Sequence, residues 1–179
     1  MKSSTAKVAL PASSTPLEQA ALPRISYRNL PQLFLKAREG LMSHFKPILQ
    51  HFNLTEQQWR VLRALDQHRQ LEPRQICQLC QIMSSSMAGV LARMEELELI
   101  ERVRVSGDQR RVLVSLSAKG DQLIEQIAPL IDVQYRQIEQ AYGQQTVDAL
   151  IMALEGFIAA GNNQVERVSL PVVADPYTD

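Results

Sequence analysis

The sequence is poor in several residue types, and each shortage excludes a class of protein. Two cysteines in 179 residues cannot build a disulfide framework. Seven glycines and nine prolines are too few for the many turns of a β-sandwich or a barrel. No apolar run reaches the roughly 18 residues that a membrane span requires, and the N-terminus lacks the apolar core of a signal peptide. We therefore expect a reduced, cytoplasmic protein.

The charges of the chain balance, because 19 lysines and arginines meet 19 aspartates and glutamates. This balance excludes a generally polybasic protein but leaves room for a locally basic surface. Hydrophobic residues make up 45% of the chain, which is enough to fill a core. The length predicts one domain with tails, or at most two domains.

Composition divides the chain into a body and two tails. Residues 1–23 are rich in serine, alanine and proline and show no sustained period, so we expect a flexible N-terminal extension. Residues 161–179 form a similar C-terminal tail. The body between them, residues 24–160, contains no linker, internal repeat or low-complexity tract.

Periodicity and capping signals predict two helices at the start of the body. Apolar residues follow the helical period from about residue 30 to residue 52, and Pro47 should kink or break this helix. The next helix has a clear start, because Thr55 can cap it and Gln58 stands at the capping-box position. We expect it to end near His68.

The middle of the body is predicted to hold two short helices and a hairpin. Pro73 opens one helix, and Ser84–Ser86 begin another. Residues 103–105 then alternate between apolar and basic, a turn is expected at Gly107-Asp108, and residues 111–116 return as a strand. This order is typical of a winged helix-turn-helix, whose hairpin forms the wing.

The outermost helices, at about residues 30–52 and 117–160, carry apolar faces that a small winged domain has no further core to cover. Pairing with a second copy would bury them and set two recognition helices about 34 Å apart. The alternative is a monomer that folds these helices onto itself. The predicted fold class is mainly α with a small β-hairpin wing, a winged helix-turn-helix with N- and C-terminal dimerisation helices.

The wing is the most basic stretch of the chain. Between residues 102 and 111 it has one acidic residue, Asp108, and four arginines: Arg102, Arg104, Arg110 and Arg111. Arginines at a hairpin tip can reach phosphates or enter a narrow minor groove. The alternative is a solvated charged hairpin, which the preceding helix-turn-helix disfavours.

The candidate recognition helix starts with Ser84, Ser85 and Ser86 and carries Arg93 on its outer side. Small hydroxyl side chains let the backbone approach a groove and bond to phosphates or base edges, although serine there can also act only as a helix cap. Acidic residues crowd the far end of the helix, so only its N-terminal half can enter DNA. They are Glu95, Glu96, Glu98 and Glu101.

Two motifs of the wing resemble the signature of the MarR family: Asp108-Gln109-Arg110-Arg111, and Leu116-Ser117 followed by Gly120. Residues 36–43, 54–61 and 89–95 resemble a subgroup that includes repressors of homoprotocatechuate and hydroxycinnamate degradation operons and of a fatty-acid efflux system.

The resemblance implies a homodimeric repressor that binds a pseudo-palindromic operator in double-stranded DNA and is released by an aromatic acid. It implies a DNA-binding lobe at about residues 54–116. Arg110 would enter the minor groove, Asp108 would order the wing, and Ser84–Ser86 with Arg93 would lie along the major groove. The alternative is a regulator of an efflux or stress operon that responds to a fatty acid or another lipophilic acid.

The chain departs from the subgroup at two positions. The subgroup commonly starts the recognition helix with Arg-Pro-Ser, whereas this chain has Ser84-Ser85-Ser86 and so lacks an arginine that could read guanine. The family commonly ends this helix with glycine, whereas Glu98 stands here. We expect Glu98 to adopt a left-handed conformation at some cost, or the helix to end differently.

An aromatic acid needs a flat apolar slot and a cationic or hydroxyl anchor. Arg38 lies within two helical turns of Ser43, His44 and Phe45, while Trp59 and Arg63 share one face of the next helix. The resemblance places effector pockets between the dimer helices and the DNA-binding lobe. The alternatives are a surface pair of Arg38 with its neighbouring glutamate, and a Trp59 that only packs on Leu54 as a hydrophobic staple.

Other functions find little support in the sequence. Cys77 and Cys80 lack the further ligands of a zinc site and the context of a redox pair, although thiol sensing stays open. No nucleophile elbow, phosphate loop or metal cluster suggests an enzyme, a cofactor or a metal. A winged helix that binds an acidic protein partner is a third class of function.

Overall fold

The computed structural model describes residues 25–105, 108–161 and 165–170. The chain forms two compact units, Met1–Arg38 and Glu39–Asp179, which we describe separately. The predicted extension at residues 1–23 and the turn residue Gly107 lie outside the described residues. None of the described helices is long and apolar enough to span a membrane.

Helix α1 (Leu30–Ser43) and helix α2 (Lys46–His51) replace the single helix that periodicity suggested. Pro47 stands in the first turn of α2, where its missing N–H leaves no helical bond unmade. The predicted break at this proline is therefore confirmed.

Helix α3 (Glu56–His68) begins and ends as predicted. The backbone N–H of Gln58 donates to Thr55 Oγ1 over 3.2 Å, and the backbone N–H of Thr55 donates to Gln58 Oε1 over 2.8 Å. This capping box satisfies two N–H groups that a helix start otherwise leaves open. Leu54 and Trp59 flank it and are both buried, as a hydrophobic staple requires.

Helices α4 (Pro73–Cys80) and α5 (Ser84–Glu96) follow, and α3 packs against both. Strand β1 (Gln70–Leu71) precedes them, and β2 (Ile100–Val105) and β3 (Asp108–Leu116) form the hairpin. The three strands make one antiparallel sheet in the order β1-β3-β2. The sequence analysis missed β1 and started the last strand at residue 111, after its actual beginning.

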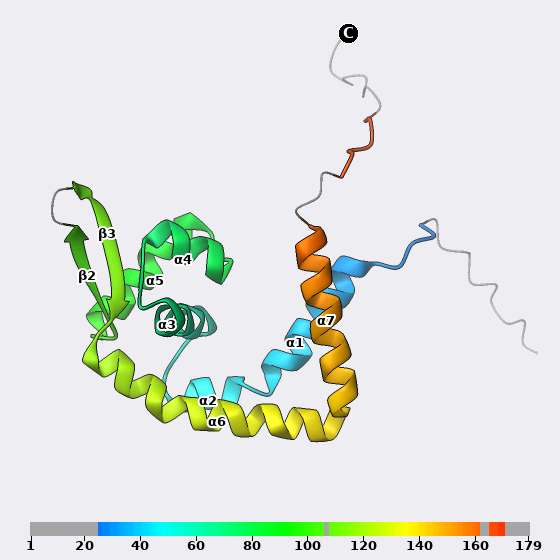
Figure 1. Cartoon of the computed structure of the whole chain (residues 1–179), viewed down its shortest axis with the longest axis horizontal. Helices are drawn as coiled ribbons and strands as arrows, with labels where there is room; N and C mark the ends of the chain where they lie inside the picture. The colour runs from blue at the N-terminus through cyan, green and yellow to red at the C-terminus, as the bar shows by residue number, and fades with distance from the viewer. Residues whose placement is uncertain (1–24, 106–107, 162–164, 171–179) are drawn as a thin grey trace, which may run out of the picture. The chain divides into compact units, whose positions relative to one another are not determined.

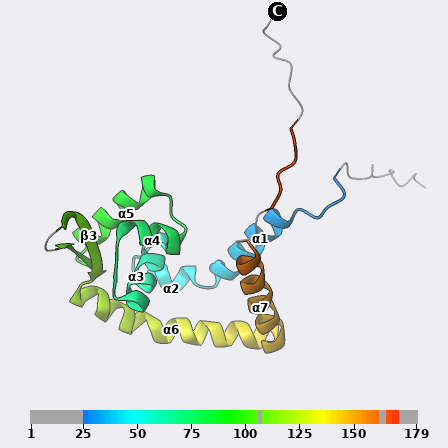
Figure 2. The ribbon, with the colours of Figure 1, turned by 45° about the horizontal axis from the view of Figure 1, so that its top comes forward.

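Helix α6 (Ala118–Tyr142) is the longest element of the second unit, and α7 (Gln144–Ala160) packs on its C-terminal part. Figures 1 and 2 show α3, α4, α5 and the hairpin gathered near the N-terminal part of α6. The chain turns between the two helices at Gly143, whose φ of 88° favours glycine. The start of α6 after Ser117 and the end of α7 before Gly161 agree with the prediction.

The core lies between α3, α4, α5, α6 and the sheet. Its most deeply buried side chains are Val61, Leu62, Leu65, Ile76, Leu91, Met94, Val114 and Ile127. This core fixes the two helices of the helix-turn-helix and the base of the hairpin relative to α6. The predicted fold class, mainly α with a small β wing, is confirmed.

Candidate nucleic-acid interface and effector site

The first turn of α5 is open at the surface. Its N-cap is Met83, which makes no side-chain capping bond, so the serines do not cap the helix. Ser84 and Ser85 are exposed and Ser86 is half-buried, and none of their hydroxyls bonds to another described residue. These hydroxyls and the first N–H groups of the helix are therefore available to acceptors such as phosphates.

The other end of α5 is occupied by ion pairs. The exposed Arg93 donates from Nη1 to Glu96 Oε2 over 2.9 Å, and Arg102 of β2 meets Glu95 at 3.1 Å. The outward position predicted for Arg93 is confirmed. A phosphate that bound either arginine would have to compete with its glutamate.

The arginines of the wing are placed differently from one another. Arg104 is exposed on β2 opposite Val112 and forms no ion pair among the described residues. Arg111 of β3 is held by Glu72, with Nε at 2.8 Å and Nη2 at 2.5 Å from Glu72 Oε1. Asp108 and Arg110 belong to β3 by their backbone, but their side chains lie outside the described part of the chain.

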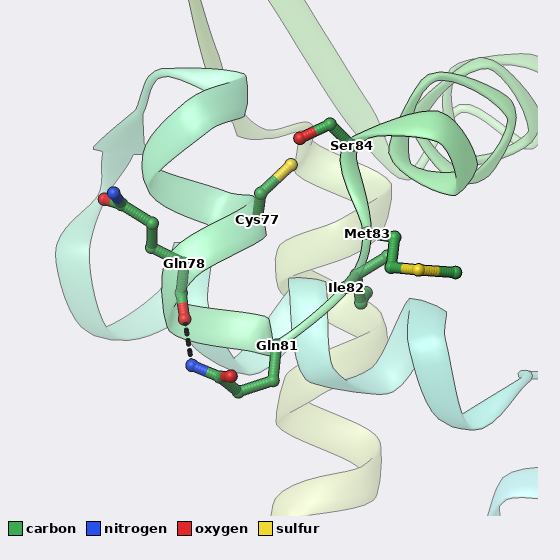
Figure 3. A pocket seen from close by; sticks show the side chains of 6 residues that line it. All are labelled: Cys77, Gln78, Gln81, Ile82, Met83 and Ser84. Carbon is green, nitrogen blue, oxygen red and sulfur yellow. Dashed lines mark hydrogen bonds between the residues drawn. The ribbon is translucent and has the colours of Figure 1, made fainter. Parts of the chain in front are cut away.

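An open pocket of about 420 Å³ lies beside the turn between α4 and α5 (Figure 3). The residues that line it are Cys77, Gln78, Gln81, Ile82, Met83 and Ser84. In Figure 3 the thiol of Cys77 points toward Ser84, the first residue of the recognition helix. None of the predicted effector residues lines this pocket.

The thiol of Cys80 is part of a reciprocal contact between α4 and α3. Its Sγ donates to the carbonyl oxygen of Arg60 over 3.4 Å, and Arg60 Nη1 donates to the carbonyl oxygen of Cys80 over 2.5 Å. Burial raises the pKa of the Cys80 thiol, against the opposing effect of the Arg60 charge. The neutral thiol is therefore favoured, and it serves as a structural donor.

No group of three or more potential metal ligands occurs in the described ranges.

The predicted effector residues fall into three groups. Arg38 is exposed and belongs to the first unit, so its relation to the others is not described. Ser43 donates to the carbonyl oxygen of Gly40 over 2.6 Å at the end of α1.

His44 and Phe45, at the junction of α1 and α2, contact α6. His44 Nε2 is 2.9 Å from Tyr142 Oη, and the rings of Phe45 and Tyr135 are 4.9 Å apart. The sequence analysis missed both tyrosines because their apolar rings fit the helical stripe of α6. Their hydroxyl groups were the signal that separated them from ordinary core residues.

Trp59 and Arg63 form the third group, on α3. Trp59 is 8% exposed, and the guanidinium carbon of Arg63 lies 6.0 Å from its ring centroid, at the limit of a cation–π contact. Arg63 is exposed, so its charge can face an anion while the indole remains in the core. The staple position of Trp59 and a role beside an effector are compatible.

Comparison with known proteins identifies relatives of this arrangement. The profile of the MarR family matches residues 52–111. The homoprotocatechuate degradative operon repressor of Escherichia coli is 37% identical over 134 residues, which cover 75% of this chain and 90% of that protein. The transcriptional regulator FarR of Neisseria gonorrhoeae is 38% identical over 62% of this chain and 76% of its own length.

A solved structure extends the comparison to a ligand-bound state. The crystal structure of NadR in complex with 4-hydroxyphenylacetate superposes with a TM-score of 0.67 at 33% identity. The superposition covers 76% of this chain and 96% of NadR. The similarity therefore spans the helices and the hairpin together.

Proposed function

The chain belongs to the MarR family of DNA-binding transcriptional regulators, and on that premise we propose that it is a dimeric repressor of an aromatic-acid catabolic operon. A small aromatic carboxylic acid of the hydroxycinnamate or hydroxyphenylacetate type releases it from its operator. Membership in a family of transcriptional regulators confirms that the protein is not an enzyme.

The open first turn of α5 is the observation that supports DNA binding most strongly. Exposed serine hydroxyls and uncapped N–H groups stand at the start of a helix that the wing flanks. We assign Ser84, Ser85, Ser86 and Arg93 to the major groove. The sequence analysis assigned Arg104, Asp108, Arg110 and Arg111 of the wing to DNA, and we retain the first three, because Arg111 is held by Glu72.

The exposed apolar side chains of α7 support a homodimer. None of its residues is buried, and several large apolar side chains are exposed. They include Leu150, Ile151, Met152, Phe157 and Ile158. A monomer would leave this surface in water, whereas a second copy related by a two-fold axis would bury it twice.

The proposed effector site uses the residues around α2, α3 and α6. A relative at 33% identity was crystallised with 4-hydroxyphenylacetate, an aromatic carboxylic acid. Phe45 and Trp59 are buried aromatic residues of this region, and the exposed Arg63 beside Trp59 offers a cation for the carboxylate. His44 and Ser43 complete the proposed set, whereas Arg38 belongs to the first unit and stays a prediction from the sequence.

The effector must prefer the form of the dimer that does not bind DNA. Shifting a population from 99:1 to 1:99 requires about 5.5 kcal/mol of preference. Two effector sites in a dimer can share this free energy. Each acid would then need only a moderate difference in affinity between the two forms.

The first prediction concerns the operator and its effector. We expect the purified protein to bind a labelled duplex from upstream of its own gene, with an affinity that falls steeply with salt because phosphates are neutralised. A panel of hydroxycinnamates, 4-hydroxyphenylacetate, homoprotocatechuate and medium-chain fatty acids is then added, and DNA release is followed by fluorescence anisotropy. We expect release at micromolar concentrations by an aromatic acid.

The Arg63→Gln variant, which keeps the length of a polar side chain without its charge, should bind DNA normally and need at least tenfold more acid. Arg69→Gln, another exposed arginine near the end of α3, is the matched control. Release only by fatty acids would favour the efflux or stress alternative. Absence of binding both to this duplex and to any sequence selected from random DNA would contradict the repressor function.

A further inference from the structure

We propose that Glu72 is a positioning residue that braces the wing against helix α4, and that Arg111 is its partner in this brace and not a ligand for phosphate. The proposal rests on the proposed function, because it concerns how the wing is presented to DNA. It replaces the assignment of Arg111 to a direct DNA contact.

Glu72 stands between β1 and α4 and contacts the hairpin. It follows β1 directly and is the N-cap of α4. Its Oε1 atom accepts from both Nε and Nη2 of Arg111, at 2.8 and 2.5 Å. Both donors share the single acceptor Oε1, and the directions of the two N–H groups limit how the guanidinium can turn about that oxygen.

The ion pair acts where backbone pairing to β1 has ended. The ladder between β1 and β3 pairs Gln70 with Ser115 and Leu71 with Val114. Arg111 lies further along β3 toward the hairpin turn. The pair of Glu72 with Arg111 therefore ties a part of β3 that β1 does not reach.

A second ion pair, Arg102–Glu95, also joins the hairpin to a helix, but it lies nearer to the base of the wing. Arg102 stands opposite Val114, at the level where β1 is still paired. Arg104, by comparison, stands opposite Val112, beside Arg111 in the register. Among the described residues, Glu72 is thus an acid that contacts the hairpin at the level of Arg104.

Partial exposure of the pair limits its strength but not its directional effect. The side chains of Arg111 and Glu72 are 55% and 34% exposed. Exposed ion pairs contribute little to overall stability. A small change in the direction of the hairpin is nevertheless amplified in binding, because two wings of a dimer must reach one DNA duplex together.

Bracing and direct phosphate binding predict opposite effects of removing the Glu72 carboxylate. If Arg111 binds phosphate, Glu72 competes with DNA, and its neutralisation should strengthen binding. If the pair braces the wing, neutralisation should weaken binding to the operator. The same substitution therefore separates the two roles by the sign of the effect.

The experiment compares Glu72→Gln, Arg111→Gln and the double variant that carries both substitutions. Glutamine preserves size and keeps a side-chain oxygen for the capping box of α4, in which the side chain of residue 72 accepts from the backbone N–H of Gln75. The reciprocal bond, from the backbone N–H of residue 72 to Gln75 Oε1, does not involve the substituted side chain. The matched control is Glu101→Gln, which removes an exposed carboxylate of β2 that forms no ion pair among the described residues. Circular dichroism verifies that each variant is folded.

Each variant is titrated with operator and with unrelated duplex at several salt concentrations. We expect Glu72→Gln and Arg111→Gln each to lower operator affinity about two- to thirtyfold, the range for one exposed pair removed from each of two wings. Affinity for unrelated duplex and the salt dependence should stay unchanged. The double variant should lose no more operator affinity than either single variant, and Glu101→Gln should bind equally well or more tightly.

Two results would overturn the proposal. The first is tighter binding by Glu72→Gln, together with a salt slope that falls by about 0.9 for each phosphate that Arg111→Gln no longer neutralises. This result would make Arg111 a phosphate ligand. The second is a double variant, Glu72→Gln with Arg111→Gln, whose loss of operator affinity equals the product of the two single losses, which would show that the two residues are not coupled.

Hydrogen exchange without DNA provides an independent test. The backbone amides of Arg104 and Val112 should exchange faster in Glu72→Gln and in Arg111→Gln, and at the wild-type rate in Glu101→Gln. If the wild type binds no DNA, the proposed function fails. The exchange rates still test whether the pair of Glu72 with Arg111 holds the wing in place. Equal rates in all four proteins would contradict it.

Discussion

At the scale of single residues, Glu98 shows the cost of a helix that ends without glycine. Its φ is 60°, a left-handed conformation that side chains with a Cβ rarely adopt. The conformation lets the N–H of Leu99 reach the carbonyl oxygen of Met94 over 2.9 Å, which closes the end of α5. The strained conformation expected from the sequence at this position is confirmed.

Replacing Glu98 by glycine should stabilise the protein by about 0.5–1 kcal/mol, because the left-handed backbone costs a residue with a Cβ about 1–2 kcal/mol. The gain is reduced by removal of the exposed ion pair with Lys119, at 3.2 Å. Urea unfolding measures the difference. The control Glu98→Ala removes the ion pair but keeps the Cβ, so it should be no more stable than the wild type. Equal stabilisation by both variants would contradict the backbone argument.

At the scale of elements, Ser117 and Gly120 hold the end of β3 and the start of α6 against Leu99, which follows the end of α5. Ser117 caps α6 by accepting from the Gly120 N–H over 3.0 Å, and its own N–H donates to the carbonyl oxygen of Leu99 over 3.2 Å. A Cβ on Gly120 would overlap that same carbonyl oxygen. The serine and the glycine of the wing signature therefore have a packing role that places β3 and α6 against the recognition helix.

The Gly120→Ala variant should be less stable by about 1–3 kcal/mol, the range for overpacking, because backbone must move to admit the methyl group. Gly89→Ala is the control, since nothing lies within 4 Å of a Cβ at that position of α5. It should be more stable by about 0.5–1 kcal/mol from helix propensity. Thermal unfolding of both variants tests the close packing of Gly120 on Leu99, and equal stability of the two variants would exclude it.

Local signals allowed most helices to be predicted, whereas contacts between distant residues were not visible in the sequence. Thr55 and Gln58 lie three residues apart, so one short window contains the whole capping box. Strand β1 exists only through its pairing with β3, far along the chain, and two residues carry no period of their own. The pair of Glu72 with Arg111 was missed for the same reason.

The candidate site could likewise be predicted only in part from the sequence. The outward direction of Arg93 follows from helical geometry, but its pairing with Glu96 depends on side-chain conformations. The contacts of Phe45 with Tyr135 and of His44 with Tyr142 join segments that only the tertiary fold brings together. Residue types could therefore be assigned to the site, whereas their neighbours could not.

At the scale of the whole molecule, the recognition helix of one chain cannot read a pseudo-palindrome alone. A dimer places two such helices one DNA turn apart, at about 34 Å, so that both half-sites are bound in one event. Helix α7 carries the exposed apolar residues that we assign to this pairing. Dimerisation and operator affinity should therefore depend on the same side chains.

Substituting Ile158 by arginine should separate the chains and abolish tight operator binding. Its side chain is 70% exposed on α7, so the change does not disturb the described core but would place a charge in the apolar interface. The control Glu155→Lys changes the charge of an exposed polar position on the same helix. Sedimentation velocity should show a monomer only for Ile158→Arg, and anisotropy should show at least a 100-fold decrease in operator affinity for that variant alone. A dimer that persists in Ile158→Arg would mean that another surface pairs the chains, because a buried unpaired arginine is too costly for an interface to retain.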